Sequence, residues 1–184
     1  MFTIRSTSLI AMLLLSAAWV GAQENEPAVQ RQLEIDANAQ ATLDKLFSEK
    51  ADTRALFDRA AGYAVFTATK AGFLVTGGGG TGVAVNKSTG QRTYMRMGTG
   101  GVGLGIGAQR YDLVIMFEDQ AHLDRFVGGG WDASASAQAA AGTEGITLTS
   151  SFVGGVAFFQ ITDRGLMAQA DVSGTRFWVI DDLN

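Results

Sequence analysis

The stretch from Gly98 to Phe117 constrains the fold of this chain more than any other segment, because glycine occupies every second position from Gly101 to Gly107. The positions between these glycines hold Val102, Leu104 and Ile106. Successive residues of a β-strand point to opposite faces, so this pattern predicts a strand with one branched apolar face and one bare face. Glycine weakens a strand unless something approaches its backbone closely. We therefore expect another layer to pack on the bare face, and the Ala- and Ser-rich run 132–142 is the expected neighbour.

The first 22 residues have the pattern of a secretory signal peptide. A short start carrying Arg5 precedes the apolar run Leu9 to Val20, and small residues up to Ala22 offer a cleavage site. Twelve residues are too few to span a bilayer comfortably, although an uncleaved membrane anchor is the alternative. Residues 23–28 contain the only proline and are predicted to be a flexible leader, and residues 29–184 are predicted to form a single domain. The predicted localisation is therefore periplasmic or secreted.

Composition excludes several classes of function. The chain has no cysteine, and hence neither a disulfide nor a thiolate metal site. Removal of the segment containing Arg5 would leave 13 basic and 18 acidic residues, a net charge of −5. A nucleic-acid-binding protein needs a basic surface, so no nucleic-acid partner is expected.

The fold class is predicted to be α+β. Helix-forming residues dominate from Val29 to Ala61, with an apolar stripe at Val29, Leu33 and Ala37 that Leu43, Leu46 and Phe47 continue. A break near residues 48–52 divides this region into two helices. From Tyr63 onward short strands and glycine turns follow, interrupted by a short helix that Asp119 caps. We expect a glycine-rich, largely antiparallel sheet curled into a barrel or a sandwich.

The predicted strands and turns occupy distinct segments of the second half of the chain. The turns 86–90 and 162–165 are expected to close antiparallel hairpins. The expected strands cover residues 63–69, 72–76, 81–86, 91–97, 101–109, 111–117, 133–139, 156–162, 166–172 and 177–180.

Residues for catalysis or for holding a cofactor are scarce. His122 is the only histidine, and the sequence has no Gly-x-Ser-x-Gly motif to supply a nucleophile, so no catalytic residue is predicted. One histidine without cysteine does not favour a zinc or iron site. The glycine runs lack the Gly-Lys-Ser/Thr of a phosphate-binding loop, and a strand rather than a helix follows them. We predict neither a metal nor another cofactor.

Basic and aromatic residues of the strand region are the candidate binding residues. Basic side chains that converge could hold an anionic head group through charge-assisted hydrogen bonds, and aromatic side chains beside glycines could contact acyl chains. The candidates for lipid binding are Lys70, Phe73, Arg92, Arg96, Arg110 and Trp131.

Several short motifs occur in the order found in one known family. They are Lys70-Ala-Gly-Phe73 before the glycines, Gly107-Ala-Gln within the opening stretch, Leu123-Asp-Arg-Phe126, the small residues after Trp131, and Arg164-Gly-Leu-Met-Ala168 followed by Val172-Ser-Gly174. Over roughly residues 43–180 the chain resembles the SYLF domain family, a lipid-binding domain also described as an actin-binding domain in fungal members. The resemblance implies a non-enzymatic domain that binds phospholipid, in bacteria as an exported envelope protein.

The sequence thus predicts an exported phospholipid-binding protein whose partner is an anionic phospholipid or a membrane surface. Two other interpretations remain open: a small outer-membrane β-barrel or structural envelope protein, and a hydrolase that uses carboxylates.

Overall fold

Two helices open the structure, a computed structural model that describes the backbone of residues 9–129, 151–162, 165–167 and 174–184. Side chains are described from residue 27 onward within those ranges, apart from 73–76, 101–107 and 165–167. Helix α1 (Leu9–Glu49) and helix α2 (Asp52–Arg59) are separated where the sequence predicts a break. However, α1 runs without interruption through residues 23–28, the predicted flexible leader, and includes Pro27. The boundary of the signal peptide stays a prediction.

The face that α1 buries differs in part from the predicted stripe. Leu43 and Leu46 are buried as expected, and with Ile35 they pack onto the sheet. In contrast, Val29 and Leu33 are 47% and 57% exposed. The prediction for these two residues was wrong because i, i+4 spacing defines a stripe on a helix without showing which stripe is buried. The stripe that packs onto the sheet is the one through Ile35.

Most of the predicted strands merge into one very long antiparallel hairpin. Strand β1 (Gly62–Asn86) pairs with strand β2 (Arg92–Phe117) from Gly62 opposite Phe117 to Val85 opposite Arg92. The turn between them is fastened by the Asn86 side chain, which accepts hydrogen bonds from the backbone N–H groups of Ser88 and Thr89. The predicted hairpin at 86–90 is therefore confirmed, whereas the predicted gaps within each strand were wrong.

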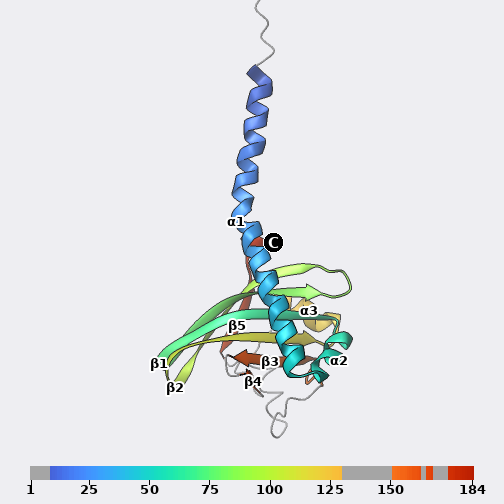
Figure 1. The fold of residues 1–184 in the computed structure, drawn as a ribbon, viewed down its shortest axis with the longest axis vertical. Coiled ribbons are helices and arrows are strands. Elements are labelled where there is room, and N and C mark those ends of the chain that lie inside the picture. Colours follow the sequence, from blue (N-terminus) through green and yellow to red (C-terminus); the bar gives the residue numbers. More distant parts are fainter. Residues whose placement is uncertain (1–8, 130–150, 163–164, 168–173) are drawn as a thin grey trace, which may run out of the picture.

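The long hairpin bends sharply in its middle and folds back on itself, as Figure 1 shows at the left end of β1 and β2. The pairing register shifts between Gly72 and Leu74, at the position of the bend. The alternating glycines 101–107 lie in β2 at this bend, opposite residues 72–76 and their neighbours. We call residues 62–71 of β1 with 108–117 of β2 the first half, and residues 77–86 with 92–100 the second half.

Bare glycines let the two halves approach closely. A Cβ atom on Gly78, Gly80 or Gly82 of β1 would collide with a backbone carbonyl oxygen of the first half of the same strand, that of Thr69, Thr67 or Val65, in that order. Glycine is thus required here by close approach of one backbone to another. The predicted packing on a glycine face is seen at these positions, while the side-chain surroundings of 101–107 and the run 132–142 lie outside the described residues.

Among the described residues, three further strands complete a five-stranded sheet in which every pair is antiparallel. With the helices, this makes the fold α+β, as predicted. Strand β3 (Val156–Thr162) extends the first half beside β2, and strand β4 (Gly165–Met167) pairs with β3, which confirms the predicted second hairpin. Strand β5 (Thr175–Val179) pairs with the second half of β2. Within the described residues these strands form one bent sheet that does not close into a barrel, so the expected barrel was wrong.

Two apolar clusters hold this arrangement together. One lies between α1 and the sheet and includes Leu46, Val65 and Val83, so α1 contacts both halves of the hairpin. The other contains Phe66, Met95 and Phe126, which come from the first half, the second half and helix α3 (Gln120–Val127). Asp119 caps α3 by accepting a hydrogen bond from the His122 N–H, as predicted. A short 3-10 helix, η1 (Asp181–Leu183), ends the fold.

Candidate binding surface on strands β2 and β5

The structure does not gather the predicted binding residues into one cluster. Lys70 and Arg110 lie in the first half of the hairpin, where the pairs Lys70–Gln109 and Thr69–Arg110 direct their side chains to opposite faces. Arg92 and Arg96 lie in the second half and share one face of β2. Phe73 lies in β1 with its side chain outside the described residues, and Trp131 is outside them altogether.

Arg92 takes part in a polar cluster beneath α1. Its Nε lies 3.4 Å from Oδ2 of Asp36, and the Tyr94 hydroxyl donates to the same oxygen over 3.1 Å. Burial, with a further contribution from the Asp36 carboxylate, raises the pKa of Tyr94 above its ordinary value. Arg92 is therefore engaged by the protein's own carboxylate, whereas Arg96, four residues further along β2, lies beyond this cluster.

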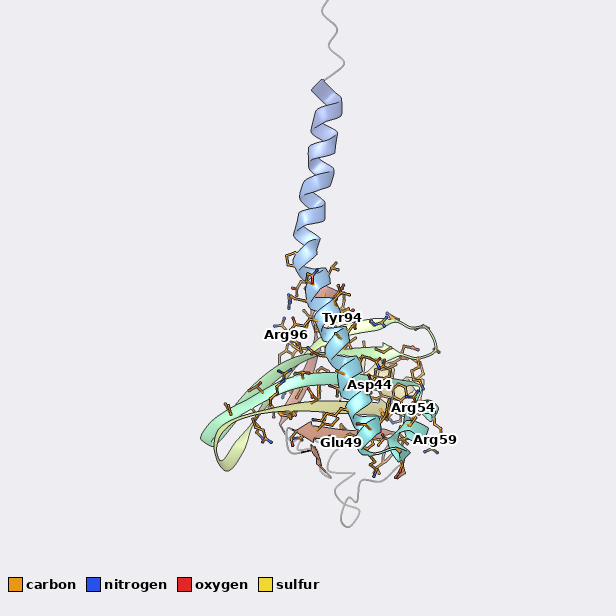
Figure 2. The ribbon with its side chains drawn as sticks, in the orientation of Figure 1. Asp44, Glu49, Arg54, Arg59, Tyr94 and Arg96 are labelled. Atoms are coloured by element: carbon orange, nitrogen blue, oxygen red, sulfur yellow. The ribbon has the colours of Figure 1, made fainter. Side chains whose placement is uncertain are left out.

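An uncovered part of the sheet begins at Arg96, and Figure 2 shows Arg96 to the side of α1 while Tyr94 lies next to the helix. We call it the open face. Register places its residues in rows across β1, β2 and β5. It consists of Thr81, Gly79 and Gly77 of β1, Arg96, Gly98 and Gly100 of β2, and Trp178 and Arg176 of β5.

The open face combines two cations with an aromatic ring on a floor of glycine. Arg96 is directly opposite Trp178, and Gly98 is directly opposite Arg176. Trp178 is 44% exposed, and its ring lies over Gly98, where a Cβ would come within 2.8 Å of it. A Cβ on Gly77 or Gly100 would meet nothing within 4 Å, so this part of the floor is open to solvent. Bare backbone thus extends beside the arginines.

Both arginines of the open face are available for an external anion. Arg96 and Arg176 are exposed, and neither forms an ion pair with a residue in the described part of the chain. Their side chains come from diagonal positions on neighbouring strands, where Cβ atoms are about 7 Å apart. Two guanidinium groups at this spacing can converge on one phosphate or carboxylate group.

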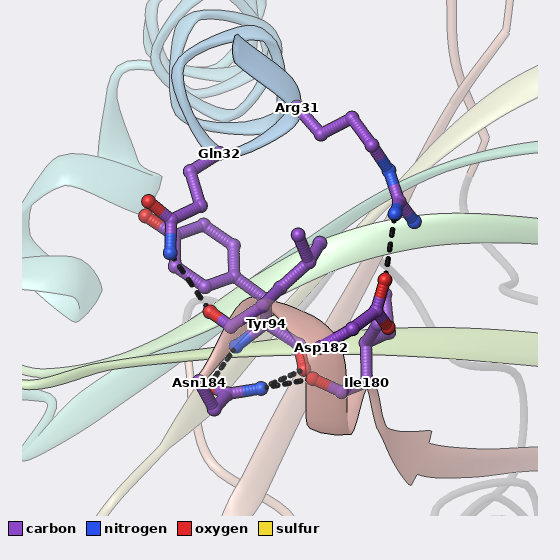
Figure 3. A network of polar contacts seen from close by, with 7 residues as sticks. Arg31, Gln32, Tyr94, Ile180, Asp182 and Asn184 are labelled. Carbon is purple, nitrogen blue, oxygen red and sulfur yellow. Dashed lines mark hydrogen bonds and ion pairs between the residues drawn. The ribbon is translucent and has the colours of Figure 1, made fainter. Parts of the chain in front are cut away.

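The strand that carries Trp178 and Arg176 is anchored firmly at its C-terminal end, as Figure 3 shows. The Asn184 side chain accepts from the Tyr94 N–H over 2.9 Å and donates to the carbonyl oxygens of Tyr94 and Ile180 over 3.0 and 2.6 Å. From α1, Arg31 pairs with Asp182 at 2.9 Å. These contacts fix the end of β5 against β2 and α1 and so position the open face.

The sequence pointed to Arg96 but missed Arg176 and Trp178. The alternation in Thr175-Arg-Phe-Trp-Val179 was the available signal, because it places Arg176 and Trp178 on one face and the more buried Phe177 on the other. A residue on an adjacent strand cannot be paired with Arg96 until the register of β2 and β5 is known.

His122 has a structural environment. Its Nδ1 lies 2.8 Å from Oδ1 of Asp119. Its ring packs against Gly155, where a Cβ atom would collide with the ring and where the φ of +80° also favours glycine. Hydrogen bonds from the His122 backbone N–H, the larger contribution, and from the His122 side chain hold the pKa of the Asp119 carboxyl below its ordinary value. Within the ranges that the structure describes, no group of three potential metal ligands gathers.

Among the described helices, none combines the length and apolar character required to cross a membrane.

Comparisons with known proteins support the resemblance seen in the motifs. A family model described as "Ysc84: Las17-binding protein actin regulator" matches residues 98–184, which include all of the open face contributed by β2 and β5 except Arg96. Beta cell expansion factor A of Aeromonas veronii is 41% identical over 156 residues, which is 85% of this chain. The match covers 60% of that relative's length. The chain therefore carries a domain of the Ysc84, or SYLF, family.

Proposed function

We propose that this protein is an exported, non-enzymatic protein that binds anionic phospholipid at the cell envelope, and that the open face is its contact surface. The observation that carries the proposal is the pair Arg96 and Arg176 beside the exposed ring of Trp178. Guanidinium groups bind phosphate oxygens with charge-assisted hydrogen bonds. Tryptophan is favoured at the boundary between lipid and water, where its ring meets acyl chains and its N–H stays hydrated.

The glycine floor supports the same proposal through shape. Gly77, Gly79 and Gly100 carry no side chain that would hold a membrane surface away from the arginines. The eight residues of the open face include no acidic side chain, so the local charge is positive although the whole chain has a net charge of −4. A protein with overall negative charge can thus present one locally basic surface to anionic lipid.

Sedimentation with lipid vesicles tests the proposal. We expect the protein to sediment with phosphatidylcholine vesicles that contain phosphatidylglycerol and not with phosphatidylcholine alone, and binding should weaken as salt screens the charges. The double variant Arg96→Glu, Arg176→Glu should bind at least about tenfold more weakly, because each basic residue near an anionic surface contributes about 1 kcal/mol.

A charge-matched variant separates a local effect from a change in net charge. Arg54→Glu, Arg125→Glu alters two exposed arginines outside the open face and produces the same change in net charge. This control should retain most of the binding. Equal losses in both double variants would show that the open face is not the contact surface, and no binding to either vesicle at low salt would refute the lipid-binding function.

A further inference from the structure

A groove of about 290 Å³ with both polar and apolar lining lies between helix α3 and the closed end of the long hairpin. Its volume is close to the lower limit for sites that take small molecules. Side chains from both strands and from α3 converge on it. The lining residues are Ala84, Asn86, Gln91, Thr93, Gln120, Leu123, Asp124, Val127 and Gly128.

One side of the groove is organised by a directed chain of hydrogen bonds. Asn86 is fixed because its Oδ1 accepts from the N–H groups of Ser88 and Thr89. Its Nδ2 donates to Oε1 of Gln120 over 3.0 Å, and Nε2 of Gln120 donates to Oδ1 of Asp124 over 2.6 Å. This series of hydrogen bonds ends at the exposed carboxylate of Asp124, whose other oxygen can accept a hydrogen bond from a ligand. The polar groups are thus held in place before a ligand binds.

The other side of the groove offers groups that are both donors and acceptors. The Gln91 side-chain amide and the Thr93 hydroxyl have no hydrogen-bond partner among the described residues. The floor is apolar and contains the buried side chains of Ala84 and Leu123. An amide, a hydroxyl and a carboxylate around an apolar floor match a ligand that has hydroxyl groups on its rim and C–H groups on one side.

The charge of the residues that line the groove favours a neutral ligand over an anion or a cation. Asp124 is its only ionisable residue, so nothing in the groove balances an anionic ligand. An ammonium ion could meet Asp124 but has no acceptor capacity for the donors of Gln91 and Thr93. Hydroxyl groups both donate and accept, and therefore satisfy all three residues.

We propose that the groove between α3 and the β1–β2 hairpin is a binding site for a neutral carbohydrate, with Asp124, Gln91 and Thr93 contacting its hydroxyl groups. The site is separate from the open face. It uses the Thr93 side of β2, whereas Arg96 lies on the opposite side of the same strand. The proposal therefore does not depend on lipid binding.

Titration of the ¹⁵N-labelled full chain with N-acetylglucosamine and with glucose, followed by NMR, tests the site. We expect saturable shifts of the amide signals of Gln91, Thr93, Gln120 and Asp124, with a dissociation constant on the order of 1–10 mM for a single ring. Choline and inorganic phosphate, as a cation and an anion, should leave these signals unchanged.

A matched pair of variants tests the role of the carboxylate. Gln40 donates to Asp44 over 2.9 Å on α1 with the same i,i+4 geometry as Gln120 and Asp124, but outside the groove. Asp124→Asn should weaken sugar binding about tenfold, as expected for loss of a charged hydrogen-bond partner, and Asp44→Asn should leave it unchanged.

Three results would overturn the carbohydrate site, and all can be obtained without relying on a variant. The first is that neither sugar shifts the groove signals of the wild-type chain. The second is that the sugars shift only signals elsewhere in the protein. The third is that choline or phosphate shifts the groove signals more strongly than the sugars do.

Discussion

At the scale of single residues, Asn184 acts as a substitute for a neighbouring strand. Its amide exchanges two hydrogen bonds with the backbone of Tyr94, one in each direction, as an opposing peptide group would. The Asn184 amide also donates a hydrogen bond to the Ile180 carbonyl oxygen. One side chain thus closes the end of the β2–β5 ladder.

We predict that Asn184→Ala lowers the free energy of unfolding by about 1–2 kcal/mol, because three hydrogen bonds disappear and only some of the groups regain water. Asn184→Asp should cost more, since both donors are lost and a carboxylate faces two carbonyl oxygens. Urea denaturation measures both changes. Gln40→Ala, on the exposed side of α1, serves as the control; an equally small effect in all three variants would contradict this role for Asn184.

Local chemistry allowed some single residues to be predicted and not others. Asp119 was predictable as a cap because the interaction spans only three residues, from its carboxylate to the His122 N–H. Arg96 was found as a strand cation. Its neighbours Arg176 and Trp178 were missed, because they are about eighty residues away and the β2–β5 register brings them together. Side-chain clusters across strands depend on that register.

At the scale of elements, glycine decides whether the long hairpin can bend. Gly80 faces the backbone of Thr67 and Ala68, and backbone atoms cannot move aside as the end of a flexible side chain can. Gly77, three residues earlier in the same strand, has open space where a Cβ would lie. The two positions therefore form an internal comparison within one strand.

We expect Gly80→Ala to lower the free energy of unfolding by about 2 kcal/mol, the range for overpacking a close contact. Gly77→Ala should change it by less than about 0.5 kcal/mol, or stabilise the strand slightly, because alanine restricts the unfolded chain. Denaturant titration of both variants gives the comparison. If the two substitutions had equal effects, close approach of the two halves would not be the reason for glycine.

The elements themselves were predicted better than their connections. Residues 156–162 form a strand with the expected bounds, because the segment is apolar and turn residues flank it. The separate strands expected on either side of Gly77–Gly80 are one continuous strand. Glycine runs usually mark turns, and their use to bend a continuous strand depends on what packs against them, which no local pattern contains.

At the scale of the whole molecule, the N-terminal part of α1, blue in Figure 1, extends away from the sheet. Further along the helix, Ile35 and Ala39 belong to the apolar cluster beneath α1, and Ala28 packs against it. We therefore expect that loss of the first 22 residues shortens α1 and leaves the described core in place.

We predict that the exported protein begins at Gln23 and that its thermal midpoint equals that of the uncleaved chain. Intact-mass spectrometry of protein recovered from the periplasm or the medium identifies the first residue. A mass that retains residues 1–22 would favour the anchor over the signal peptide, and a large drop in midpoint on cleavage would show that the segment packs against the domain.

The bend of the long hairpin also bears on whether the protein aggregates in solution. Strand β1 stands at the end of the strand order, and the edge of a sheet can recruit strands from other molecules. In this protein the second half of β1 lies close against its first half, with Gly78, Gly80 and Gly82 facing the backbone of residues 65–70. A chain whose bend is forced open would expose that edge to its neighbours. Substitution of these glycines by residues with a side chain should therefore cause aggregation during synthesis before any loss of binding is seen.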